Sequence, residues 1–194
     1  MRISGGAAKG RRIPYKKASA RGKDEERLRP TSSKVREAIF DILRDRIDGS
    51  SFVDLYAGSG SVGIEALSRG AKKVTFVETN ILRIRIIEQL LSEFGFKEKA
   101  EIIRSKAYDF IEREARRGGS YDIIFLDPPY QSEELMKVLP LIGRTRVLKD
   151  NGVVVAEHFS KRTLPDNIEG LTMVRSYRYG DTALTVYRSG AGDG

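Results

Sequence analysis

A short acidic corner in this 194-residue sequence carries residue types that could activate an amine. Asp127, Pro128, Pro129 and Tyr130 follow directly after the apolar run Ile123–Leu126. Each proline fixes its own φ and holds the preceding residue extended, so the oxygen acceptors of the corner point in fixed directions. A carboxylate and a backbone carbonyl placed in this way can accept both N–H groups of an exocyclic amine on a nucleobase. These bonds favour a pyramidal nitrogen whose lone pair can attack an electrophile, and Tyr130 offers a flat face on which an extruded base can stack.

A glycine-rich segment upstream could hold that electrophile. Gly58, Gly60 and Gly63 have the spacing Gly-x-Gly-x-x-Gly and follow the mostly apolar run 52–56. Glycine is needed where the backbone must approach a ligand without a Cβ in the way. Glu78 lies twenty residues after Gly58, where an acid can accept hydrogen bonds from both hydroxyls of a ribose. The spacing alone fits a nicotinamide dinucleotide as well as S-adenosylmethionine (SAM).

Asp54 favours SAM over the dinucleotide. It lies four residues before Gly58, inside the end of the same predicted strand. Dinucleotide sites usually have apolar residues there, because the pyrophosphate is anionic. A carboxylate suits the ammonium group of a methionine moiety instead. Together with the acidic corner, this pattern predicts methyl transfer from SAM to an amino group of a base.

Strands and helices are predicted to alternate through most of the chain, which is typical of a parallel sheet with helices on both faces. Strands are predicted over 52–56, 73–78, 100–104, 121–126, 152–157, 170–178 and 182–188. Helices are predicted near 32–48 and over 61–69, 80–94, 107–117 and 132–147. The expected fold is α/β and Rossmann-like, as in SAM-dependent methyltransferases, with a mostly parallel seven-stranded sheet and an antiparallel final strand. A small β-hairpin is expected at the N-terminus.

The net charge of +8 is concentrated near the N-terminus. Residues 1–36 hold twelve basic and three acidic residues, whereas the rest of the chain sums to −1. Such asymmetry indicates an arm that binds a polyanion on a near-neutral domain. A merely solvated tail is the alternative, but Ile3, Ile13 and Tyr15 make the arm more than a low-complexity segment.

Composition excludes several other classes of protein. The absence of cysteine excludes disulfides and thiol catalysis, and the single histidine, His158, excludes a histidine-rich metal site. His158 has no evident catalytic partner, so a structural or solvent-facing role is expected. No apolar run approaches the roughly 20 residues that span a bilayer, and no signal peptide is evident. We therefore expect no metal, no membrane association and a cytoplasmic location.

Over nearly its whole length the sequence resembles the RsmD family, bacterial 16S rRNA guanine-N2 methyltransferases. The resemblance is carried by Met1-Arg2-Ile3 with Gly5-Gly6, Lys9-Gly10-Arg11, Leu28-Arg29-Pro30-Thr31, Val35 to Phe40, Asp54 to Gly63, Glu65 to Ala71, and Tyr179 to Thr182. It implies that the substrate is one guanine of 16S rRNA in the small ribosomal subunit and that SAM is the cofactor. We also expect a monomer. Charge and element pattern predict a basic N-terminal RNA-binding arm at 1–28, a methyltransferase domain at 29–188 and a disordered tail at 189–194.

Residue type, spacing and the resemblance together predict a role for each candidate site residue. The expected catalytic residues are Asp127, Pro128, Pro129 and Tyr130. The expected cofactor-binding residues are Arg29, Thr31, Asp54, Tyr56, Ala57, Gly58, Gly60, Glu78, Thr79 and Ala107. The expected RNA-binding residues are Arg2, Lys9, Arg11, Arg12, Lys16 and Lys17.

One position departs from the pattern. Related enzymes often have an acid just after the third strand for the adenine amino group, but here Lys106 stands in that region and cannot accept a hydrogen bond. Either a backbone carbonyl or Ser105 takes this role, or the adenine pocket differs, and Ala107 is expected to contribute through its backbone. Three alternatives remain open on the sequence: an N6-adenine methyltransferase, a nicotinamide-dependent oxidoreductase and a non-catalytic RNA-binding module.

Overall fold

The computed structural model describes residues 2–13, 32–130 and 132–189. Its strands are β1 (Ser51–Asp54), β2 (Lys73–Glu78), β3 (Ala100–Arg104), β4 (Tyr121–Leu126), β5 (Leu148–Phe159), β6 (Asn167–Ile168), β7 (Leu171–Tyr179) and β8 (Thr182–Ser189). Its helices are α1 (Ser33–Ile42), α2 (Ser61–Ser68), α3 (Ile81–Phe94), α4 (Ala107–Arg117) and α5 (Glu134–Gly143), with a short 3₁₀ helix at Lys97–Lys99. The predicted alternation of strands and helices is confirmed.

All the strands form one sheet in the order β3-β2-β1-β4-β5-β8-β7-β6. The first five in this order are parallel to one another, and β8 is inserted antiparallel between β5 and β7. The antiparallel final strand is therefore confirmed. The sheet has eight strands rather than the seven predicted, because the two-residue β6 adds an edge that is too short to show any alternation of hydrophobicity.

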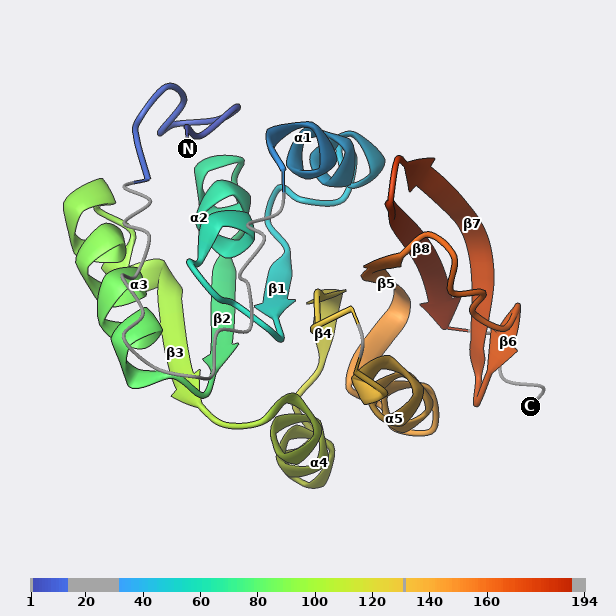
Figure 1. Cartoon of the computed structure of the whole chain (residues 1–194). Coiled ribbons are helices and arrows are strands. Elements are labelled where there is room, and N and C mark those ends of the chain that lie inside the picture. The colour runs from blue at the N-terminus through green and yellow to red at the C-terminus, as the bar shows by residue number, and fades with distance from the viewer. Residues whose placement is uncertain (1, 14–31, 131, 190–194) are drawn as a thin grey trace, which may run out of the picture.

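Helices cover both faces of the sheet and bury two separate cores (Figure 1). One core lies between the sheet and α1, α2 and α3, and Ile39, Phe52 and Phe76 are fully buried in it. The other lies between the sheet and α4 and α5, with Phe110 and Val138 at its centre. Apolar side chains on both faces explain why the central strand β4 reads as a continuous apolar run.

The N-terminal segment, residues 2–13, packs against the first core. The predicted hairpin is reduced to one antiparallel bridge between Arg2 and Arg12. Ile3, Ala8 and Ile13 are buried among the core residues. These hydrophobic contacts fix the segment to the domain. The charge pattern of the segment does not predict them.

The last strand extends by one residue into the predicted tail. Ser189, which the sequence analysis assigned to the tail, is the last residue of β8, and the rest of the tail lies outside the described residues.

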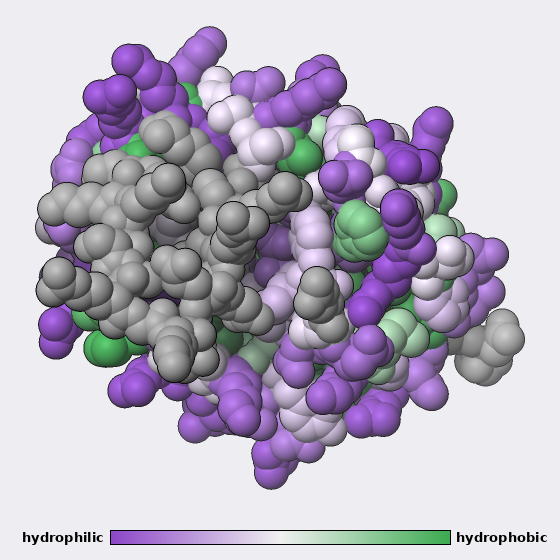
Figure 2. Space-filling model, viewed as in Figure 1, coloured by the Kyte–Doolittle hydropathy of each residue, from purple (hydrophilic) through white to green (hydrophobic). Residues whose placement is uncertain are grey.

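Within the described ranges, no helix combines the length and apolar character that crossing a bilayer requires. Where those residues are in view, Figure 2 shows hydrophilic side chains around most of the rim, with hydrophobic ones exposed in small separate areas.

Candidate active site

The glycine turn and the acidic corner leave the sheet side by side. β1 and β4 are neighbouring parallel strands, and Asp54 is paired with Phe125 across them. The pairing continues beyond β1, since the Leu55 amide donates to the Phe125 carbonyl at 3.0 Å. Ligands of open α/β sheets bind beyond the carboxyl ends of the strands. The register therefore brings the two predicted chemical segments to one edge of the sheet.

The glycine turn is a tight backbone loop between β1 and α2. Gly58 and Gly60 both have positive φ, 55° and 74°, which a side chain would strain. The Gly60 amide donates to the Ala57 carbonyl at 2.7 Å, and the Ala57 amide donates to the Val77 carbonyl at 3.1 Å. At Gly63 a Cβ would lie 2.3 Å from the Phe76 ring. Two glycines thus shape the turn, and the third lets α2 pack closely on β2.

Asp54 is buried at the end of β1 with part of its carboxylate unused. Its Oδ2 accepts from the Gly63 amide at 3.2 Å, whereas its buried Oδ1 has no hydrogen-bond partner among the described residues. Burial, reinforced by the charges of Asp127 and Glu78 and opposed by the backbone amides of Gly63 and Tyr56, raises the pKa of Asp54 to about 7. A buried acceptor of this kind calls for a donor, and a cationic donor would satisfy it best.

Glu78 holds the glycine turn to the end of β2. Its Oε2 accepts from the Gly58 amide at 2.9 Å, and its Oε1 accepts from the amides of Thr79 and Asn80 at 2.8 and 2.9 Å. Arg83 lies 3.6 Å from the same carboxylate. The carboxylate is thus anchored beside the turn, as the predicted ribose acceptor must be. Since each oxygen has two lone pairs, capacity for a hydroxyl remains on Oε2.

The acidic corner follows β4 as predicted. Asp127 is half-buried, Pro128 is buried and Pro129 is exposed. The Pro129 carbonyl is already occupied, because it accepts from the Ser132 amide at 2.9 Å and from the Ser132 hydroxyl at 2.7 Å. Asp127 and the Pro128 carbonyl are therefore the acceptors on which the predicted chemistry depends.

Tyr130 is held in place by side chains of β5 and β8, for which the sequence analysis assigned no such role. Its hydroxyl lies 2.7 Å from Thr182 Oγ1 and 3.2 Å from Glu157 Oε1. Burial, partly offset by the Thr182 bond, raises the pKa of this phenol. The Phe159 ring lies 6.2 Å away at an interplanar angle of 30°. Thr182 was part of the family resemblance, whereas nothing in the sequence indicated Glu157 or Phe159.

Tyr56 and Ala107 also lie at this edge of the sheet. The Tyr56 hydroxyl donates to Glu134 Oε2 at 3.2 Å, which connects the β1 loop to the start of α5, and burial raises its pKa. Ala107 is buried at the start of α4. β3 ends beside Glu78, which is paired with Arg104, so Ala107 lies one strand away from the predicted ribose site. Lys106 is exposed.

The predicted RNA-contacting residues divide into two groups. Arg2, Lys9, Arg11 and Arg12 are exposed on the N-terminal segment. Arg11 is partly engaged in packing, because it donates to the Glu93 carbonyl at 2.8 Å and lies over the Phe94 ring. Lys16 and Lys17 lie outside the described residues, as do Arg29 and Thr31, which were predicted to bind the cofactor.

His158 is buried between β5 and β8 and makes two polar contacts there. His158 Nδ1 faces the Phe159 carbonyl at 3.0 Å and Nε2 faces Thr185 Oγ1 at 2.8 Å. A carbonyl can only accept, so Nδ1 carries the proton, and burial lowers the pKa of the ring. The imidazole is a buried neutral link between β5 and β8. Within the described residues no group of three or more metal-ligating side chains is present.

The chain is similar to known proteins both in sequence and in structure. The family described as "Conserved hypothetical protein 95" matches residues 1–188. "Putative rRNA methyltransferase YlbH" of Bacillus subtilis is 36% identical, covering 97% of this chain and 98% of its own. "Ribosomal RNA small subunit methyltransferase D" of Haemophilus influenzae is 34% identical, with 92% of each chain covered. The solved structure of "Putative methyltransferase yhhF from Escherichia coli" is 29% identical with a TM-score of 0.83, covering 98% of both chains.

These matches extend over the N-terminal segment and the whole sheet, so they are not limited to the glycine motif that many nucleotide-binding proteins share. The chain therefore belongs to the conserved hypothetical protein 95 family, the RsmD-like methyltransferases, and has their SAM-dependent methyltransferase fold.

Proposed function

We propose that this protein transfers a methyl group from SAM to the exocyclic N2 amine of one guanine in 16S rRNA of the small ribosomal subunit. The observation that carries the proposal is the β1–β4 register, which sets Asp54 and the glycine turn beside Asp127 and its diproline. A methyl donor held by the first segment and an amine held by the second would face each other across one strand spacing. In-line positioning of this kind can supply most of the rate gain of a transfer reaction.

The residues at the end of β1 and β2 fit the cofactor. The unpartnered Oδ1 of Asp54 suits the ammonium group of SAM, and Glu78 lies where the ribose hydroxyls would meet it. The positive φ at Gly58 and Gly60 brings bare backbone to the same place. When bound, SAM supplies a methyl group on a sulfonium, which is already an electrophile.

The acidic corner fits the target amine. Asp127 and the Pro128 carbonyl accept its two N–H groups and aim the nitrogen lone pair at the methyl carbon. As the N–C bond forms and the S–C bond breaks, the nitrogen becomes an ammonium acidic enough to lose its proton to water. No strong base is therefore required. Stacking of the base on Tyr130 adds roughly 1–3 kcal/mol of binding, and the phenol's bonds to Thr182 and Glu157 hold the ring in place.

The relatives favour small-subunit rRNA as the substrate, whereas the choice of guanine over adenine follows from the resemblance to the RsmD family. Proteins named ribosomal RNA small subunit methyltransferase D align over most of this chain at 30–34% identity. The corner itself does not distinguish the two amines, since both offer an NH2 group. Mass spectrometry of nucleosides from 16S rRNA, compared between cells with and without this protein, tests the choice. Loss of one N2-methylguanosine supports the proposal, and an unchanged N2-methylguanosine content contradicts it.

Calorimetry tests the cofactor separately. SAM should bind the purified protein and NAD should not, because Asp54 would repel a pyrophosphate and attract an ammonium group. Binding of NAD without binding of SAM would assign the site to an oxidoreductase.

A further inference from the structure

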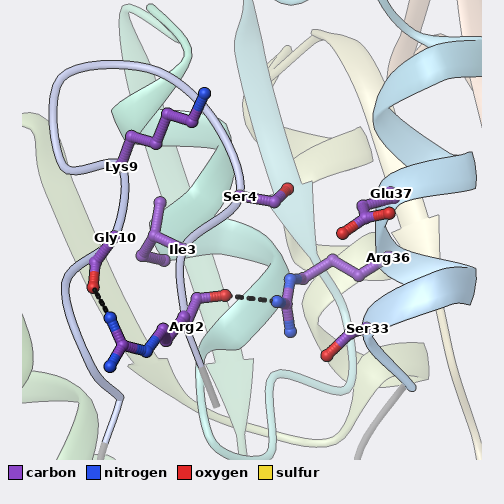
Figure 3. A pocket seen from close by; sticks show the side chains of 8 residues that line it. All are labelled: Arg2, Ile3, Ser4, Lys9, Gly10, Ser33, Arg36 and Glu37. Atoms are coloured by element: carbon purple, nitrogen blue, oxygen red, sulfur yellow. Dashed lines mark hydrogen bonds between the residues drawn. The ribbon is translucent and has the colours of Figure 1, made fainter.

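A hollow of about 440 Å³ lies between the N-terminal segment and α1 (Figure 3). It lies on the face of the sheet that α1 and α2 cover, and its lining includes Arg2 and Lys9, two of the residues predicted to contact RNA. The residues that matter for its chemistry are Arg2, Ser4, Lys9, Ser33, Arg36 and Glu37. Three are basic and one is acidic, so the lining has a net positive charge.

Arg36 is the unusual residue of this hollow, because it is a guanidinium with only 1% of its surface exposed. Its Nε donates to Glu65 Oε2 at 2.7 Å, and its Nη2 donates to the Arg2 carbonyl at 2.6 Å. Its buried Nη1 has no hydrogen-bond partner among the described residues. Figure 3 shows this guanidinium between the backbone of Arg2 and the side chain of Ser33. Leaving a buried charged donor unpaired is costly, so the position favours an acceptor from a ligand.

The charge behind Arg36 is also incompletely balanced. Glu65 is fully buried and is shared, because Arg69 Nη2 lies 2.9 Å from its Oε1 while Arg36 holds its Oε2. Two guanidinium groups therefore share one carboxylate and leave one positive charge at the base of the hollow. The N-terminus of α1, at Ser33, adds the positive end of a helix dipole.

We propose that this hollow binds one phosphate group of the RNA backbone, with Arg36 Nη1 as its buried donor and Arg2 and Lys9 as exposed contacts at the rim. The assignment to RNA rests on the proposed function. A phosphodiester carries one negative charge and several acceptor oxygens, which match a guanidinium edge. Glu37, also at the rim, disfavours a doubly charged phosphate monoester more than a singly charged diester.

The position suits a contact beside the target base. α2 begins at Ser61, directly after the glycine turn, and ends at Ser68, whose carbonyl accepts from the Ala7 amide at 2.7 Å. A helix of eight residues is about 12 Å long. One RNA segment could therefore reach from the acidic corner to the hollow across a few nucleotides and be held at both places.

Titration with inorganic phosphate tests the hollow without RNA. The ¹⁵N side-chain signals of the arginines should include a buried guanidinium that shifts with phosphate and not with chloride at equal ionic strength. Arg2→Ala and Lys9→Ala should each weaken phosphate binding several-fold, and Glu37→Gln should strengthen it. Arg2→Ala keeps the carbonyl that Arg36 uses, so the fold is not at risk. Lys72→Ala, an exposed lysine in a distant turn, should behave as the wild type.

Binding to small subunits that lack the modification tests the source of the phosphate. The slope of log affinity against log salt should fall by roughly 0.7–0.9 for each contact removed at Arg2 or Lys9, and stay unchanged in Lys72→Ala. Phosphate that leaves every arginine signal unmoved overturns the site. Phosphate binding with wild-type salt slopes in both variants overturns its assignment to RNA. Absence of methyl transfer by the wild type would instead overturn the proposed function, and the titration would still report on the hollow.

Discussion

At the scale of single residues, Asp127 is the group whose loss should separate chemistry from cofactor binding. It follows β4, whereas the glycine turn follows the neighbouring β1, and in the proposed function it holds the target amine and not the cofactor. Asp127→Ala should therefore lower turnover by at least about 100-fold while leaving SAM affinity nearly unchanged. Single-turnover assays and calorimetry on the same preparation measure both quantities. Asp45→Asn changes an exposed acid in the turn after α1, is the matched control and should retain normal turnover.

Asp54 should make SAM binding depend on pH. Its raised pKa means that the carboxyl is half protonated near pH 7 in the free protein, whereas the ammonium group requires the ionised form. SAM affinity should therefore fall about tenfold for each pH unit below 7. It should fall again above about pH 8, where an α-amino group loses its own proton. In Asp54→Asn the acidic limb should be absent, and a wild-type limb in that variant would assign the titration to another group.

The Asp54 carboxyl should also make the stability of the fold depend on pH. Its contribution to stability should fall with rising pH, over the range in which SAM affinity rises. The folded protein holds the Asp54 proton more tightly than the unfolded chain, whose pKa is near 3.8. The contribution of Asp54 to stability is thus fully present below about pH 4 and is lost as pH rises through 7. Urea unfolding from pH 5 to 8 should show Asp54→Asn gaining stability relative to the wild type as pH rises. A constant difference between the two proteins across this range would contradict the raised pKa.

At the scale of the elements, Glu65 on α2 connects three segments. It holds Arg36 on α1, Arg69 at the end of α2 and Ser4 on the N-terminal segment. Removing one partner of a buried ion pair typically costs about 3–5 kcal/mol, because the remaining charge stays buried. Glu65→Gln should therefore lower the free energy of unfolding by this order and increase hydrogen exchange at residues 3–13.

An exposed ion pair provides the control for Glu65. Glu101 binds Lys73 at 2.6 Å on the surface, where such pairs contribute at most about 1 kcal/mol. Glu101→Gln should be nearly neutral in urea unfolding. Equal effects of the two substitutions would mean that the buried cluster does not hold the N-terminal segment in place.

The elements also show how much of the structure could be predicted from the sequence. The strands, the glycine turn and the corner after β4 were predictable, because each depends on local spacing and on apolar runs. The tether of Tyr130 was not predictable, since its hydroxyl meets Glu157 and Thr182, which are 27 and 52 residues away. The Arg36–Glu65 pair was not predicted either. The two residues are 29 positions apart, and a charged residue on a helix is usually exposed.

At the scale of the whole molecule, the basic N-terminal segment is part of the domain as well as a charged surface. Ile3, Ala8 and Ile13 pack into the core at a spacing that matches neither a helix nor a strand, so only the tertiary contacts reveal it. Deleting this segment would expose the core together with removing its charges. Single charge substitutions at its exposed residues therefore report on RNA binding more cleanly than truncation.

Nucleoside mass spectrometry of the reaction in vitro tests the central claim most directly. Purified protein would be incubated with SAM that carries a deuterated methyl group and with small subunits from cells that lack the protein. The account predicts one labelled methyl per subunit, on N2 of a single guanine in 16S rRNA, and none with Asp127→Ala. Label on N6 of adenine, or equal labelling by Asp127→Ala and the wild type, would contradict it.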